Sequence, residues 1–210
     1  TFRQNIEKDF TIRNEFNSEQ LVYNKSLFDF KINSEEITLK TLGFLDFEMH
    51  KSTAFPFEGG EKEGIKRLNN YFFETKNISS YKETRNGLIG KDYSSKFSSW
   101  LANGSLSPVS IFHEIKKYEA EFESNESTYW LIFELIWRDF FKYTSLQFQD
   151  KIFHQNGILE NIYECTPDQH LVNQWLNGKT NSDFIDANML EIKKTGWMSN
   201  RGRQNTASYF

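Results

Sequence analysis

Cysteine and proline are scarce in this sequence of 210 residues, which contains one cysteine and three prolines. The single cysteine, Cys165, excludes an internal disulfide framework and a cysteine-cluster metal site. The low proline content, together with only 11 glycines, argues against collagen and low-complexity linkers. No run approaches the roughly 18 apolar residues of a membrane span, and no signal-peptide pattern opens the sequence. We therefore expect a soluble, cytoplasmic protein with no membrane partner.

A large charge of one sign is also missing, since 25 basic and 29 acidic residues give a net charge of −4. Any contact with nucleic acid must therefore come from a local basic patch. Hydrophobic residues make up only 38%, but aromatic residues reach 17% and include 21 phenylalanines. Because each aromatic side chain buries a large area, the sequence can still build a core.

The first 55 residues are weakly periodic and are predicted to form a linker on a surface, with a short helix at each end. Helical periodicity begins at Glu61, where Ile65, Leu68 and Phe72 predict one apolar face. Ser107 followed by Pro108 predicts the start of a further helix. Its apolar stripe comprises Ile111, Phe112, Ile115, Tyr118 and Phe122.

The most hydrophobic segment runs from Tyr129 to Phe141, with Ser127 or Asn125 as its cap. It is apolar almost all round, which predicts a central buried helix over 126–143. Further helices are expected over 168–176, over 183–194 and after Met198. Residues 77–95 and 145–166 are irregular, and no alternating strand pattern is present. The predicted class is all-α.

The two ends of the sequence are unusual. It opens on Thr1 without a methionine and stops at Phe210 in a helix-like stretch without a C-cap signal. These features predict a piece of a longer chain, and the alternative is a natural terminus that frays.

The buried segment contains charged residues that need partners. Glu134, Trp137 and Arg138 are spaced at i, i+3 and i+4, so they share a helix face. One interpretation is a Glu134–Arg138 ion pair within the core, since an unpaired buried carboxylate is costly. The other is a cavity whose carboxylate, indole and guanidinium bind a planar heterocycle.

Two further segments are rich in polar side chains. Residues 81–86 and 94–98 flank a glycine-containing turn, and hydroxyl and backbone N–H groups there could bind phosphate or serve only as helix caps. Residues 197–205 combine aromatic, amide and guanidinium groups, although a solvated basic helix start has the same composition. The four histidines have no metal-ligand spacing, so no metal site is predicted.

Taken together, these segments match a known family in order and in register. The motifs are YKETRN at 81–86, DYSSKFS at 92–98, WLANGSLSP at 100–108, STYWLIFELIWRD at 127–139, DANM at 186–189 and TGWMSNRGRQN at 195–205. Over residues 56–210 the sequence resembles the flavin-binding helical domain of the photolyase/cryptochrome family. The glutamine at position 204, directly after Arg-Gly-Arg, resembles the pattern of the DASH cryptochromes within that family. Residues 1–55 resemble the linker that precedes this domain.

The resemblance implies that FAD is the cofactor and that blue light drives repair of cyclobutane pyrimidine dimers, with single-stranded or damaged DNA as the partner. It assigns the dimer cavity to Glu134, Trp137, Asn200 and Gln204. It assigns FAD binding to Tyr81, Arg85, Ser94, Ser95, Lys96, Phe97, Ser98, Arg138, Asn200 and Arg203. Lys142 and Arg201 are the expected contacts to DNA phosphates.

The sequence also departs from the family pattern. Cys165 stands where the surface tryptophan of the electron-transfer chain is expected, and residues 181–183 replace a Gly-aromatic-Pro turn. The antenna domain with its folate site and the last flavin-binding segment are not in this chain. We therefore expect residues 1–210 alone to bind FAD weakly, to lack repair activity and to self-associate through exposed apolar surface. Besides a repair enzyme, a blue-light photoreceptor that binds nucleic acid and an inactive helical scaffold remain alternatives.

Overall fold

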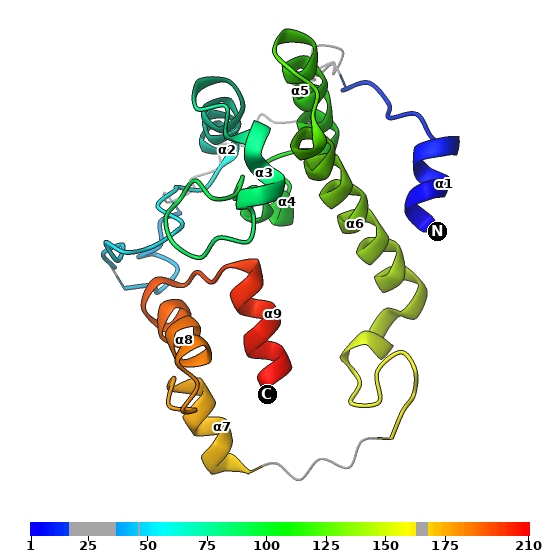
Figure 1. Ribbon diagram of the computed structural model, residues 1–210. Helices are drawn as coiled ribbons and strands as arrows, with labels where there is room; N and C mark the ends of the chain where they lie inside the picture. Colours follow the sequence, from blue (N-terminus) through cyan, green and yellow to red (C-terminus); the bar gives the residue numbers. More distant parts are fainter. Residues whose placement is uncertain (17–36, 46, 163–167) are drawn as a thin grey trace, which may run out of the picture.

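The computed structural model describes residues 1–16, 37–45, 47–162 and 168–210, and the regular structure within these ranges is helical (Figure 1). The predicted all-α class is confirmed. The α-helices are α1 (Phe2–Asp9), α2 (Glu61–Asn69), α3 (Tyr81–Thr84), α4 (Ser98–Asn103), α5 (Pro108–Glu121), α6 (Glu126–Phe148), α7 (Gln169–Leu176), α8 (Asp183–Thr195) and α9 (Asn200–Tyr209). Shorter turns are the π-helix η3 (Asn70–Glu74) and the 3-10 helices η4 (Asn77–Ser80) and η5 (Gln149–Phe153).

Side-chain caps set several helix starts where the sequence predicts them. The Ser107 hydroxyl accepts hydrogen bonds from the backbone N–H groups of Val109 and Ser110, directly before α5. Of the two caps considered for α6, Asn125 is the one that forms, because its side-chain oxygen accepts from Ser127 and Thr128 at 2.8 and 3.0 Å. α6 also runs on to Phe148, beyond the predicted boundary.

The N-terminal region agrees only in part with the predicted linker. The short helix expected at its start is α1, whereas residues 39–43 form only turns. Residues 17–36 and 46 of this region lie outside the described residues. The prediction for Cys165 also falls on a position outside them.

The main core combines buried residues of α2, η3, η4, α3, α4 and α5 with Leu131 of α6. The elements of this core that contact α6 most are α3, η4 and α5. Ile111, Ile115 and Tyr118 of α5 are at most 1% exposed, which confirms the centre of its predicted stripe. Leu68 of α2 and Phe72 of η3 are buried as expected, but Ile65 of α2 is 46% exposed. The face of α2 that is turned inward instead carries Gly64 and Arg67 beside Leu68.

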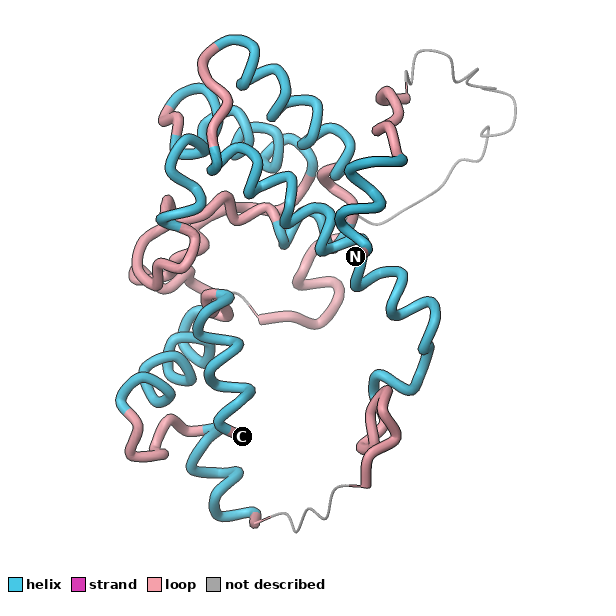
Figure 2. The backbone as a smooth tube through the Cα atoms, turned by 45° about the vertical axis from the view of Figure 1, so that its right-hand side comes forward, coloured by secondary structure: helices cyan, strands magenta, loops and turns pink. Residues whose placement is uncertain are grey.

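The position of α6 differs from the predicted central, fully buried helix. Ser127, Thr128 and Leu131 are its buried residues, all in its first two turns. Figure 2 shows the second half of the helix extending away from the helical cluster. There Trp137 and Phe141 are 41% and 60% exposed, and α1 lies alongside (Figure 1). The apolar circumference therefore reflects two environments along one helix, and the prediction of a central position is wrong for the second half.

A second, smaller cluster holds α7, α8 and α9 together. Its buried apolar residues are Ile185, Met189 and Met198, with Trp175 packed against them. The Trp175 indole N–H donates to the backbone carbonyl of Thr206 at 3.1 Å, which ties α7 to α9. Within the described residues, no helix is long and apolar enough to cross a membrane.

Candidate functional site

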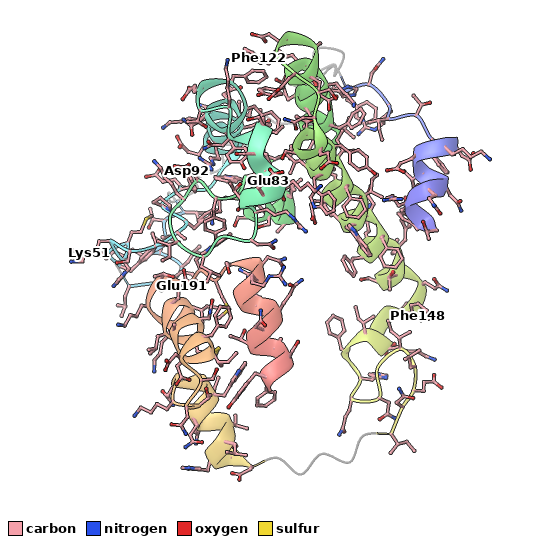
Figure 3. All side chains as sticks on the ribbon, viewed as in Figure 1. Lys51, Glu83, Asp92, Phe122, Phe148 and Glu191 are labelled. Carbon is pink, nitrogen blue, oxygen red and sulfur yellow. The ribbon has the colours of Figure 1, made fainter. Side chains whose placement is uncertain are left out.

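A cavity of about 490 Å³ lies where the main core meets the smaller cluster. This volume falls within the range of about 300–1,000 Å³ that is typical of small-molecule sites. Its walls come from α3, the loop before α4, the middle of α6 and the start of α9 (Figure 3). The predicted site residues that line it are Tyr81, Arg85, Ser94, Ser95, Lys96, Phe97, Ser98, Glu134, Arg138, Asn200 and Arg203.

Lys96 is the most unusual of these residues, since it is only 2% exposed and its Nζ has no hydrogen-bond partner among the described residues. The ammonium group lies 3.2 Å from the centroid of the Tyr93 ring and 4.9 Å from that of Trp197. Burial is the main cause that lowers the pKa of Lys96 to about 7, and the nearby positive charge of Arg67 contributes in the same direction. Asp92 and Glu191, both labelled in Figure 3, act in the opposite direction. Its unsatisfied N–H donors make Lys96 a candidate anion contact.

The backbone at Lys96 is also uncommon. Its φ of 65° lies in the left-handed region, which residues other than glycine rarely adopt. Such conformations persist where the surrounding structure enforces them, and they cluster at functional sites. The bend turns the chain from the loop into α4 at the cavity wall.

The carboxylate of Glu134 forms an ion pair with the guanidinium of Arg85, and both side chains are partly buried. Arg138 instead contacts the neighbouring Asp139, at 3.2 Å. The alternative of a Glu134–Arg138 pair is therefore wrong, because Arg85 of the segment after α3 reaches the carboxylate from across the cavity. Sequence spacing along α6 alone cannot reveal a partner that is 49 residues away.

Tyr81 and Arg203 both line the cavity. Burial raises the pKa of Tyr81 far above its ordinary value, so its hydroxyl remains protonated as a donor. The Arg203 Nε–H donates to the backbone carbonyl of Met198 at 3.1 Å, and its guanidinium lies 5.5 Å from the centroid of the Trp197 ring. Both contacts fix the direction in which Arg203 leaves α9.

The structure does not bring every predicted residue into this cavity. Trp137 lines a separate apolar groove of about 420 Å³ together with Phe2, Phe133 and Phe140. Gln204 lies outside the cavity lining and accepts a hydrogen bond from Arg201 at 3.2 Å. Of the four residues assigned to the dimer, only Glu134 and Asn200 therefore share the cavity.

The two predicted DNA contacts lie on the surface. Arg201 is exposed and also donates to the Asn86 side chain at 3.1 Å, which joins α9 to the segment after α3. Lys142 is exposed on the second half of α6. Their exposure fits contact with a charged backbone, but the two lie on different helices.

Sequence reasoning missed several residues of the site. Tyr93 and Trp197 line the cavity, and the Trp197 indole N–H lies 3.5 Å from the Tyr93 hydroxyl oxygen that accepts from it. Phe55 stacks on Trp197 with ring centroids 4.7 Å apart. Arg67 lies beneath the loop before α4, where it donates to the carbonyls of Ser94 and Ser95. No sequence pattern marked Arg67, because most of its partners are backbone carbonyls.

Comparison with solved structures defines the class. The fold matches the crystal structure of the Synechocystis sp. PCC6803 cryptochrome with a TM-score of 0.77 and 48% sequence identity, over 79% of this chain and 34% of that one. It also matches a bacterial class III photolyase from Agrobacterium tumefaciens with a TM-score of 0.71, at 21% identity, over 85% of this chain and 37% of that one. The fold is therefore that of the helical domain of photolyases and cryptochromes.

Sequence comparison narrows the class. Residues 130–210 match the family model described as the FAD binding domain of DNA photolyase. The chain is 51% identical over 157 residues to cryptochrome DASH of Danio rerio and 50% identical over 160 residues to that of Synechocystis sp.. These alignments cover 75% and 76% of this chain, and 30% and 32% of the relatives, so the chain spans about a third of their length. The chain belongs to the photolyase/cryptochrome family, and within that family it is similar to the DASH cryptochromes.

Proposed function

We propose that the cavity binds FAD and that the protein uses it for light-dependent repair of cyclobutane pyrimidine dimers in single-stranded DNA. The observation that carries the proposal is the charge of the cavity wall. Arg85, Lys96, Arg138 and Arg203 face a space in which Glu134 is the acidic side chain among the lining residues. A net positive wall suits the diphosphate of a dinucleotide.

The donor set of the cavity fits such a ligand on two further grounds. The Lys96 ammonium is buried and without a hydrogen-bond partner among the described residues, and an anion would satisfy it. Phe97, Leu101, Leu131 and Leu135 supply an apolar surface for a ring system. We assign the phosphates and the ribityl chain to Tyr81, Arg85 and residues 94–98, and assign Arg138, Asn200 and Arg203 to positions near the flavin.

When bound and reduced, FAD would supply a light-excited electron that opens the cyclobutane ring and is then returned. The protein would hold the damaged bases in place. Glu134 would bind the dimer by hydrogen bonding, and Asn200 would contact its edge from the facing wall of the same cavity. Trp137 would stack on the bases, although its ring here contacts Phe133, Phe140 and Phe141.

Single-stranded DNA is the proposed substrate because little base pairing must be broken to expose the dimer. Arg201 and Lys142 would contact its phosphates. Both are exposed, and neither belongs to the cavity lining.

The test is light-dependent loss of a single dimer from an oligonucleotide, measured by chromatography, in the full-length protein loaded with reduced FAD, because residues 1–210 alone are expected to lack repair activity. We expect loss under blue light, none in the dark, and faster loss from single-stranded than from double-stranded substrate. Flavin absorption with intact dimers under light would instead support a photoreceptor. Absence of flavin absorption from folded, FAD-treated protein would support an inactive scaffold.

A further inference from the structure

Arg67 of α2 is fully enclosed beneath the loop that precedes α4. It is 2% exposed, and its guanidinium lies 4.8 Å and 4.9 Å from the ring centroids of Phe57 and Tyr71. Burying a cation in this way is costly unless each N–H group has an acceptor. The arrangement therefore requires that the surrounding loop supply those acceptors.

The loop supplies nearly all of them. Arg67 donates to the backbone carbonyls of Lys91, Ser94 and Ser95 at 3.1, 3.1 and 3.2 Å. Its fourth and fifth hydrogen bonds reach the Asp92 carboxylate at 2.9 Å and the Asn70 side-chain oxygen at 3.2 Å. These bonds use the five N–H donors that a guanidinium possesses. One side chain thus determines where the carbonyls of residues 91–95 point.

These carbonyls immediately precede Lys96, the buried cation of the cavity. Because the carbonyls of Ser94 and Ser95 point toward Arg67, the chain is directed into the left-handed conformation at Lys96. That conformation places the Lys96 ammonium against the rings of Tyr93 and Trp197. Within this loop, no backbone–backbone hydrogen bond is seen for the described residues 91–95. Arg67 is thus the main polar support of the loop.

We propose that Arg67 is a positioning residue: its hydrogen bonds hold residues 91–96 in the conformation that binds phosphate, while Arg67 itself does not contact the ligand. The role assigned to the loop rests on the proposed function, whereas the support of the loop by Arg67 can be tested in the protein without ligand. Lysine cannot replace Arg67 fully, since its ammonium has three donors and no planar fork.

The test uses three variants in the same helix. Arg67→Met removes the donors, and Arg67→Lys keeps the charge with fewer donors. Leu68→Ala is the matched control for stability, because Leu68 is buried in the main core and does not touch the loop carbonyls. Lys66→Met is the control for charge, since that side chain is exposed.

The first readout is limited digestion of the unliganded protein with a lysine-specific protease, with fragments identified by mass spectrometry. We expect Arg67→Met to raise cleavage after Lys91 and Lys96 at least tenfold, and Arg67→Lys to raise it less. Leu68→Ala and Lys66→Met should leave these two sites at the wild-type rate under conditions where all variants are folded. Equal cleavage in Arg67→Met and Leu68→Ala would overturn the proposal, because it would show only a general loss of stability.

The second readout is binding of FAD and of ADP, followed by titration. Arg67→Met should weaken both at least tenfold, with Arg67→Lys intermediate, and with Leu68→Ala within about twofold of wild type. Unchanged FAD affinity in Arg67→Met would overturn the role of Arg67 in ligand binding. Failure of the wild-type protein to bind either ligand would contradict the proposed function instead, and the protease result would still decide whether Arg67 positions the loop.

Discussion

The two hydrophobic clusters that meet at the cavity differ greatly in size. The main core buries a dozen residues from α2 to α6, whereas the smaller cluster of α7, α8 and α9 buries Ile185, Met189 and Met198. The main core provides the loop, Tyr81 and Glu134, while the smaller cluster provides Asn200 and Arg203. A ligand in this cavity would therefore contact two walls: a firmly packed wall formed by the main core, and a weakly packed wall formed by the cluster of α7, α8 and α9.

The contacts between the two parts are aromatic and polar. Trp197 lies against Phe55 and Lys96, and Arg201 donates to Asn86. Because these contacts bury little apolar surface compared with a core, a ligand that binds both walls should stabilise their arrangement by mass action. The shape of the cavity therefore depends on the position of α7, α8 and α9, which form the less firmly packed part of the molecule.

The largest expected effect is on the free energy of unfolding, when the same substitution is made in each of the two clusters. Ile115→Ala should lower the free energy of unfolding by about 4–5 kcal/mol, because Ile115 is completely buried among large neighbours. Ile185→Ala, in the small cluster, should cost about 2 kcal/mol, since a sparse site collapses more easily. Urea denaturation followed by circular dichroism measures both. Equal losses would show that the two clusters are packed alike.

The next effect concerns the firmly packed wall. In the full-length protein loaded with FAD, Glu134→Ala should reduce dimer repair by about ten- to a hundred-fold, since a lost hydrogen bond in a dry site costs roughly 1–3 kcal/mol. Flavin retention should change less than threefold by this reasoning. The matched control is Glu126→Ala, an exposed carboxylate on the same helix that pairs with Lys82. Equal losses of flavin and repair would reassign Glu134 to a structural ion pair with Arg85.

A smaller effect tests the cation that lies between the walls. Because the pKa of Lys96 is lowered to about 7, the ammonium is half charged near that pH and fully charged only well below it. An anion binds the charged form better, so FAD affinity should be constant well below pH 7. It should fall by up to about tenfold per pH unit above 7, until the pKa of the bound state is reached. Lys96→Met should weaken binding about tenfold at pH 6 and remove this dependence. An unchanged pH profile in Lys96→Met would assign it to another group.

The smallest effect concerns the surface of the weakly packed part. Arg201→Ala should weaken binding of single-stranded DNA only severalfold and should reduce the slope of log affinity against log salt by about 0.7, as expected for one lost phosphate contact. Lys142→Ala on α6 should do the same if both parts contact DNA. Fluorescence anisotropy at several salt concentrations measures both. An unchanged slope would remove the residue concerned from the interface.

The helix pattern of this protein was largely predictable from sequence, because caps and periodicity are local. Ser107, Asn125 and the centre of the predicted α5 stripe behave as their spacing indicates, whereas Phe122, the last residue of that stripe, follows the end of α5 and is 41% exposed. Which segment covers a helix face depends on contacts between residues that are distant in the sequence. This dependence explains why the expected burial was wrong at two places. Ile65 and the second half of α6 carry apolar side chains that the described structure leaves partly exposed.

The cavity lining was predictable in its residues but not in their partners. The sequence motifs contain most of the residues that line the cavity. The pairing of Glu134 with Arg85, however, depends on how α3 packs against α6. The separation of Trp137 from Glu134 follows from α1, which lies along that side of α6. Arg67 was missed because its role is to donate to backbone carbonyls, which leave no trace in side-chain motifs.

The most direct test of the central claim is a fluorescence titration of residues 1–210 with FAD, alongside Lys96→Met. We predict weak but saturable one-to-one binding by the wild-type chain at pH 6, weakened about tenfold in Lys96→Met with unchanged helical circular dichroism. No saturable binding by a folded wild-type chain, or equal binding by Lys96→Met, would contradict the claim that this cavity holds the flavin cofactor.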